Sequence, residues 1–201
     1  MYRFFWPIVN VIIKLIFNYQ VIGANHIPAE GAAVLVANHV SMFDPVAIAL
    51  ASKRPIHFMA KAELFDNAFL RWLFTKLHAF PVKRGEADRQ AIRTALEVLH
   101  GGELLGIFPE GTRNKEEDLL PIHNGAALLA LKTESPLIPI VVKGTKKLRF
   151  RQQIIVNIGE PIIPLASDRA SKETLNQISN QIFTQLTHLS RQEFNNKERK
   201  E

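Results

Sequence analysis

Short apolar runs alternate with amphipathic segments along most of the chain. Runs typical of strands buried on both faces occur at 32–37, 56–60, 104–108, 137–142 and 154–158, and weaker strand signals occur at 20–23 and 80–83. Apolar residues at helical spacing predict helices at 45–52, 63–77, 87–100 and 124–133, and a last helix with a core face of Leu175, Ile178, Ile182, Leu186 and Leu189. Strands that alternate with helices predict an α/β fold with a mostly parallel or mixed central sheet flanked by helices.

The length of the chain fits one domain. Its 201 residues can bury a sizeable core, and the sequence contains neither an internal repeat nor an interdomain linker. We therefore expect an N-terminal helix over residues 1–20, a single domain over 21–190, and a charged, frayed tail over 191–201.

Residues 4–22 are almost wholly apolar. The polar residues Arg3, Asn10, Lys14 and Asn18 fall on one narrow stripe at helical spacing. A secretory signal would need a longer basic start and a better cleavage site, and a spanning helix would be short with a charge at its centre. We favour a helix that lies in the interface of one membrane leaflet, with Lys14 turned toward the headgroups. The alternative is a helix docked on the domain itself, because a broad apolar face also suits a protein core.

Composition and charge narrow the possible chemistry. The chain has no cysteine, which excludes disulfides, cysteine-ligated zinc and a cysteine nucleophile. Any acyl chemistry must then use a hydroxyl nucleophile or transfer the group directly to an acceptor. The formal net charge of +6 favours anionic partners, and membrane phospholipid, phosphorylated metabolites, acidic carrier proteins and nucleic acid all remain open on charge alone.

A histidine and an aspartate follow the apolar run at 33–37. His39 can take and return a proton near neutral pH, and a carboxylate such as Asp44 can hold its other ring nitrogen and fix the tautomer. A buried strand would present such a catalytic pair rigidly. The alternative is structural, because Asp44 followed by Pro45 and an apolar segment is also the pattern of a helix N-cap.

Charged residues and glycines also follow three other predicted strands. They are Lys61, then Lys83-Arg84-Gly85, then Glu110-Gly111-Thr112-Arg113. Carboxyl ends of strands are where α/β sheets bind ligands, and arginine together with a close-approach glycine suits phosphate recognition. The alternative for each cluster is a solvated turn with a local ion pair, such as one between Glu110 and Arg113.

Four motifs in order give the chain a specific resemblance. They are N-H-V-S-M-F-D at 38–44, F-P-V-K-R at 80–84, F-P-E-G-T-R at 108–113 and S-P-L-I-P-I-V-V at 135–142. This series resembles the motifs of the 1-acyl-sn-glycerol-3-phosphate acyltransferase family within the glycerolipid acyltransferases. The resemblance runs from about residue 21 to 161 and includes Gly159-Glu160-Pro161. Departures at His78, Lys83 and His123 affect the exact phosphate contacts and the preferred acceptor.

The resemblance implies a role for each matching residue. His39 would be the general base and Asp44 its orienting carboxylate. The phosphate of the acceptor would bind Lys61, Arg84 and Arg113. The acceptor pocket would be shaped by Glu110, Gly111 and Thr112. The region of the acyl donor would include Ile138, Pro139 and Ile140.

The function that the resemblance implies is acylation of the sn-2 hydroxyl of 1-acyl-sn-glycerol 3-phosphate (lysophosphatidic acid), which gives phosphatidic acid for phospholipid synthesis. The donor would be a thioester of acyl carrier protein or coenzyme A. We expect no cofactor, no metal and no nucleic acid, and a position at the cytoplasmic face of the cell membrane on the phospholipid surface. Alternatives are acylation of another lysophospholipid or of glycerol 3-phosphate, a hydrolase that uses Ser41 with His39, and a noncatalytic lipid-binding module.

Overall fold

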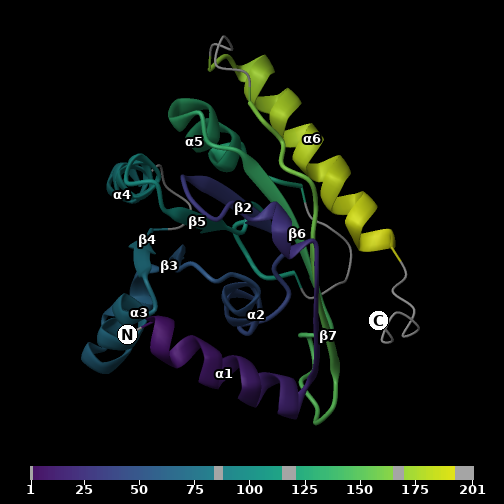
Figure 1. Ribbon diagram of the computed structural model, residues 1–201. Coiled ribbons are helices and arrows are strands. Elements are labelled where there is room, and N and C mark those ends of the chain that lie inside the picture. The colour runs from purple at the N-terminus through teal and green to yellow at the C-terminus, as the bar shows by residue number, and fades with distance from the viewer. Residues whose placement is uncertain (1, 84–87, 115–120, 165–169, 193–201) are drawn as a thin grey trace.

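Seven strands form one mixed sheet. The computed structural model describes residues 2–83, 88–114, 121–164 and 170–192. Its strands are β1 (Asn18–Ile22), β2 (Ala33–Ala37), β3 (Ile56–Lys61), β4 (Ala79–Val82), β5 (Leu104–Ile107), β6 (Leu137–Lys143) and β7 (Gln153–Ile158). They lie in the order β1-β7-β6-β2-β5-β3-β4 (Figure 1). Each predicted strand is present, with ends within two residues of the expected ones.

Five neighbouring strands of this sheet point the same way. β2 pairs in parallel with β5 and β6, and β3 pairs in parallel with β4 and β5, whereas β7 is antiparallel to β6 and carries β1 at its other side. The carboxyl ends of β2, β3, β4, β5 and β6 therefore meet at one edge of the sheet. The predicted α/β fold with a mixed sheet is confirmed, and the four motifs follow or occupy strands that end at this edge.

Helices cover both faces of the sheet. α1 (Tyr2–Ile16) and α2 (Asp44–Ala51) lie on one face, and α4 (Arg89–His100), α5 (Gly125–Thr133) and α6 (Lys172–Arg191) lie on the other (Figure 1). The short turns η1 (Ala24–His26) and η2 (Ala62–Phe65) and the helix α3 (Ala68–Lys76) complete the described elements. Alternation along the strands divides the core, so that Leu35 and Ile138 pack toward α2 while Val34 and Leu137 pack toward α5 and α6.

Two predicted helices begin later than expected because of their caps. The helix expected at 63–77 is divided into η2 and α3, since the side chain of Asn67 accepts hydrogen bonds from Phe69 N and Leu70 N and starts a new helix. α4 starts at Arg89 because Asp88 caps it, accepting from Gln90 N and Ala91 N. The carboxylate of Asp88 also accepts from Lys83 N at the end of β4, and these backbone donors, Lys83 N first, hold the pKa of Asp88 below its ordinary value.

The N-terminal helix is shorter than the predicted 1–20. α1 ends at Ile16, and Asn18 N already donates to Gln152 O as the first bond of the sheet edge. Residues 18–22 then pair with β7, so hydrogen bonding to the sheet replaces helix at the end of the apolar segment. The predicted tail from residue 193 onward lies outside the described residues.

The orientation of α1 corrects the predicted polar stripe. Asn10 is buried and its side-chain amide donates to Leu50 O in α2 at 3.1 Å, so this polar residue faces the domain rather than headgroups. Ile13 and Phe17 are buried beside it. The outer face is apolar, with Val11, Ile12, Leu15 and Ile16 exposed together with Lys14. Within the described part of the chain, no helix has the length and apolar character needed to cross a membrane.

Candidate active site

His39 and Asp44 form a buried hydrogen-bonded pair at the carboxyl end of β2. The His39 Nδ1 lies 3.0 Å from Asp44 Oδ2, and the two residues are 6% and 0% exposed. A carboxylate can only accept, so Nδ1 carries the hydrogen and Nε2 is the ring nitrogen that can accept a proton from a substrate. The structure therefore brings the predicted pair together with the tautomer that general-base chemistry would need.

Asp44 is held by donors that precede it in the chain. Its Oδ2 also accepts from Val40 N and Ser41 N, both at 2.7 Å. A helix N-cap would instead accept from the amides of the first turn that follows it. Asp44 is the first residue of α2 and its carboxylate turns back toward His39, so the capping interpretation of the sequence is wrong.

The second carboxylate oxygen of Asp44 accepts a hydrogen bond from a residue far along the chain. Thr145, two residues after β6, is 1% exposed and its hydroxyl donates to Asp44 Oδ1 at 2.5 Å. Because a buried charge is stable only when its lone pairs are satisfied, this hydroxyl completes the set of donors around the carboxylate.

The backbone of His39 is enclosed by the loop that follows β5. His39 N donates to Glu110 Oε1 at 3.1 Å, and Asn114 N donates to His39 O at 2.7 Å. Between these two contacts the chain turns at Gly111, whose φ of +68° is readily adopted only by glycine. The third motif therefore holds His39 by its main chain, and Glu110 is buried beside it.

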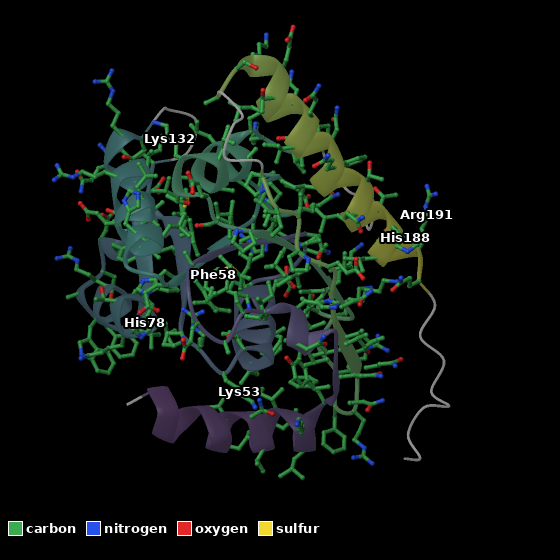
Figure 2. All side chains as sticks on the ribbon, turned by 45° about the horizontal axis from the view of Figure 1, so that its top comes forward. Lys53, Phe58, His78, Lys132, His188 and Arg191 are labelled. Atoms are coloured by element: carbon green, nitrogen blue, oxygen red, sulfur yellow. The ribbon has the colours of Figure 1, made fainter. Side chains whose placement is uncertain are left out.

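Aromatic rings support the imidazole. The ring of Phe108 stacks on that of His39 with centroids 4.1 Å apart and planes inclined by 22°. The ring of Phe58 in β3, visible in the interior in Figure 2, stacks in turn on Phe108 at 5.9 Å. Gly106 leaves the room for Phe58, because a Cβ at Gly106 would lie 2.3 Å from that ring.

Asn38 fixes the turn just before His39. Its side-chain amide donates to Val142 O at 3.1 Å, and its carbonyl accepts from Val142 N at 2.8 Å. The pair of bonds continues the β2 to β6 pairing through a side chain after the strand itself has ended. The position of His39 is therefore tied to β6 as well as to β5.

Two of the three predicted phosphate ligands, Lys61 and Arg113, lie in described segments that follow or end strands at the same sheet edge. Thr112 and Arg113 are exposed in the loop that clasps His39. Lys61 ends β3, is exposed, and lies 2.9 Å from the Glu63 carboxylate. Arg84 lies outside the described residues. Arg113 thus lies in the same loop that binds the main chain of His39, the histidine of the His39–Asp44 dyad. Lys61 instead forms a local ion pair at a solvated turn, which is the structural alternative to phosphate binding.

The residues predicted near the acyl donor belong to the core. Ile138, Pro139 and Ile140 are buried in the middle of β6, and the two isoleucines pack on the side of α2. Their contact with a donor stays a prediction.

Ser41 is held within the turn that it belongs to. Its hydroxyl oxygen accepts from Phe43 N at 3.2 Å, and the proton-accepting arrangement of His39 uses Asp44 and not Ser41. This arrangement favours direct transfer of a group to the acceptor over a mechanism in which Ser41 is the nucleophile.

Sequence reasoning assigned no role to Thr145, Asn38 and Phe108. Asn38 lies directly before His39 in the first motif, and Phe108 lies two residues before Glu110 in the third motif. These positions were the available signal. Thr145 is 101 residues from Asp44, and only the return of β6 to the edge beside β2 brings them together.

Comparisons with known proteins agree with this geometry. A family model described as Acyltransferase matches residues 18–143. A 1-acyl-sn-glycerol-3-phosphate acyltransferase of Bacillus subtilis (strain 168) is 33% identical over 166 residues, which cover 81% of this chain and 82% of that protein. A lyso-ornithine lipid O-acyltransferase of Pseudomonas aeruginosa is 38% identical over 109 residues, 53% of this chain and 41% of that protein.

A solved structure shares the fold. It is the crystal structure of the 1-acyl-sn-glycerophosphate acyltransferase PlsC from Thermotoga maritima, with a TM-score of 0.72 and 24% identity. The match covers 96% of this chain and 80% of that one.

Replacing Thr145 by valine should lower turnover because it removes a donor from the buried Asp44 carboxylate while keeping the side-chain volume. We expect kcat to fall about 10- to 100-fold, by analogy with the loss of outer-shell partners that orient a site. The KM values should change less than about twofold, and Thr145→Ser should restore most of kcat. Steady-state kinetics at a temperature well below the unfolding midpoint of each variant would measure kcat and KM.

A matched control is Thr133→Val, which removes a hydroxyl that donates to Leu129 O in α5. That variant should lose stability only. Equal kcat values for Thr145→Val and Thr133→Val would contradict a positioning role for Thr145.

Proposed function

This chain belongs to the 1-acyl-sn-glycerol-3-phosphate acyltransferase family and is an acyltransferase, and from that premise we propose its specific reaction. It transfers a fatty acyl group from a thioester to the sn-2 hydroxyl of 1-acyl-sn-glycerol 3-phosphate and so makes phosphatidic acid. The observation that carries this proposal is the buried His39–Asp44 pair, clasped by the loop that bears Arg113.

The proposed chemistry is a direct transfer. Nε2 of His39 takes the proton of the acceptor hydroxyl as its oxygen attacks the thioester carbonyl carbon. The new C–O bond forms, the C–S bond breaks, and the imidazolium returns the proton to the departing thiolate. Asp44, whose lone pairs are held by four donors, keeps the imidazole in place and stabilises its charged form. Backbone amides of the surrounding turns are the proposed stabilisers of the oxyanion.

The proposed acceptor site is the exposed part of the third motif, residues 111–113. Arg113 offers a planar fork of donors to phosphate oxygens, and Gly111 lets backbone amides approach an anion. Arg84 and Lys61 are proposed as further phosphate ligands from neighbouring strand ends, and Lys61 would exchange its partner Glu63 for the substrate.

Other acceptors and donors form the alternatives. The Pseudomonas aeruginosa relative is named for a lyso-ornithine lipid, so a similar sequence serves an acceptor with a different headgroup in that protein. A panel of lysophosphatidate, glycerol 3-phosphate and other lysophospholipids, each with coenzyme A and carrier-protein thioesters, separates these possibilities. Product from lysophosphatidate at the highest kcat/KM supports the proposal, and its absence refutes the specific assignment.

We also propose that the enzyme works as a peripheral protein on the cytoplasmic face of the cell membrane. The outer face of α1 supports the contact with a membrane surface, because Val11 and Leu15 are 58% and 66% exposed on a helix already docked through Asn10, Ile13 and Phe17. An exposed apolar stripe of this kind is stabilised when it enters the boundary between headgroups and acyl chains.

Replacing His39 by alanine should reduce kcat for lysophosphatidate about 10²- to 10⁴-fold, the usual contribution of a general base. Product formation from radiolabelled acyl thioester measures it. The exposed His100 at the end of α4 offers a control, since His100→Ala should keep wild-type turnover. A folded His39→Ala protein with full turnover would show that His39 is not the general base, whereas wild-type protein that binds lipid without any turnover would favour the noncatalytic lipid-binding module.

Replacing Arg113 by alanine should raise KM for lysophosphatidate about 10- to 100-fold, because one charge-assisted, bidentate contact is removed. The effect should be small for monoacylglycerol, which lacks the phosphate. The comparison of kcat/KM for these two acceptors in both proteins is the measurement. An equal loss for both acceptors would show that Arg113 does not read the phosphate.

The double variant Val11→Ser and Leu15→Ser should bind phospholipid vesicles about 10- to 100-fold more weakly, because less apolar area is buried on binding. Cosedimentation with vesicles measures the binding constant. Phe183→Ser changes an exposed apolar residue of α6, in the opposite layer, and should bind as wild type does. Unchanged binding of the double variant would remove α1 as the anchor.

A further inference from the structure

The turn between β6 and β7 alternates cations with large apolar side chains. Residues 146–151 read K-K-L-R-F-R, which gives four positive charges and no carboxylate. All six residues are exposed, with Leu148 at 45% and Phe150 at 78%. The motifs do not include this turn, and the proposed chemistry leaves these side chains unused.

The turn is held at both ends. On one side Thr145 donates to Asp44, immediately after Gly144, whose φ of +82° permits the reversal. On the other side Arg151 N donates to Ile16 O at 2.7 Å, at the carboxyl end of α1. Within the turn, Gln152 N donates to Arg149 O at 2.9 Å. Hydrogen bonds therefore fix the exposed tip between the His39–Asp44 pair and α1, and Figure 1 shows the β6–β7 turn beside the end of α1 at the bottom of the molecule.

The turn adjoins the outer apolar face of α1. Ile16, which receives its hydrogen bond, is itself 39% exposed and belongs to that face together with Ile12 and Leu15. Exposed apolar residues flanked by cations are the composition of elements that sit at an anionic membrane interface. Lysine and arginine bind the headgroups there, while aromatic and aliphatic side chains enter the layer below.

We propose that the β6–β7 turn is a second lipid-binding element, specific for anionic phospholipid. Lys146, Lys147 and Arg149 bind headgroup phosphates, and Leu148 and Phe150 insert between the lipids. The inference rests on the proposed function at a membrane surface. It adds that binding of this turn to lipid places the His39–Asp44 dyad at the level of the headgroups. An acidic carrier protein would also attract the cations, but a 78% exposed Phe150 next to the apolar face of α1 favours lipid.

Neutralising the turn tests the electrostatic part. The triple variant K146Q, K147Q and R149Q should bind vesicles that contain phosphatidylglycerol about 100-fold more weakly, at roughly fivefold per cation near an anionic surface. Binding to phosphatidylcholine vesicles should change little, and added salt should reduce the difference between wild type and variant. Equal binding of the triple variant and wild type to anionic vesicles would overturn the proposal.

A matched control removes three exposed cations from the opposite layer of helices. The variant R89Q, K132Q and K172Q has the same net charge as the turn variant, and its sites lie on α4, α5 and α6. Lys132 is seen on the side of the molecule away from α1 in Figure 2. The control should bind anionic vesicles within about threefold of wild type, since charges beyond a Debye length of the surface are screened. A loss as large as that of the turn variant would show that only net charge matters.

Insertion can be measured at one site because the chain has no cysteine. Phe150→Cys, labelled with an environment-sensitive fluorophore, should show a blue shift and higher emission when anionic vesicles are added. Phe183→Cys on α6, labelled in the same way, should show neither change. An unchanged spectrum at position 150 on bound protein would overturn insertion, whatever the triple variant does.

Turnover separates failure of this inference from failure of the proposed function. With short-chain lysophosphatidate and acyl coenzyme A, both dissolved as monomers, the triple variant should react as fast as wild type. Wild-type protein that binds vesicles but acylates no lysophosphatidate would refute the reaction and leave the turn to be judged by binding. A triple variant with normal vesicle binding and a selective loss with the carrier-protein thioester would assign the turn to the carrier and overturn the lipid proposal.

Discussion

The carboxylate of Asp44 is the constraint on which the site depends. It is fully buried, and an ionised carboxylate without hydrogen bonds in such a place would be strongly destabilising. Four donors remove that penalty: the His39 ring, the amides of Val40 and Ser41, and the Thr145 hydroxyl. Because they come from the end of β2 and the end of β6, the carboxylate is satisfied only when both strand ends are in their native places. The hydrogen bonds that stabilise the carboxylate therefore also orient the His39 imidazole.

The parallel part of the sheet makes this possible. β2, β5 and β6 are neighbours that end at one edge, so the segments that follow them converge without a long connection. Asn38 links the end of β2 to β6, and the loop after β5 binds His39 through Glu110 and Asn114. The imidazole is stacked on Phe108, whose ring rests on Phe58 of β3. If His39 acts as the proposed base, an imidazole held from three neighbouring strands meets a bound hydroxyl without reorganising, and much of the rate advantage of such sites arises in this way.

Local sequence patterns predicted most of the fold and the His39–Asp44 pair. Buried strands and amphipathic helices have periods that can be read directly, so the sheet, its strand ends and the His39–Asp44 spacing followed from the sequence. Long-range contacts carry no such signal, and Thr145 could not be assigned from its neighbours. Asn10 was misjudged for a related reason: a polar residue that finds Leu50 O as an acceptor on α2 looks, in sequence, the same as one that faces solvent. Asp44 was ambiguous because one residue begins a helix and also serves the base.

One short turn, between β6 and β7, connects the His39–Asp44 pair to the surface that we propose contacts the membrane. A Cβ at Gly144 would lie 1.9 Å from Gln153 O, so β6 and β7 can approach there only with glycine, and that tight reversal sets the position of Thr145 beside Asp44. The same turn then exposes the basic and aromatic tip and closes on Ile16 of α1. In the proposed reaction the acceptor hydroxyl lies just below the headgroup layer, whereas the imidazole proposed to deprotonate it is buried. Because the exposed tip and the donor to Asp44 are neighbours on one constrained turn, the same short segment fixes the surface proposed to contact lipid and the position of the His39–Asp44 pair.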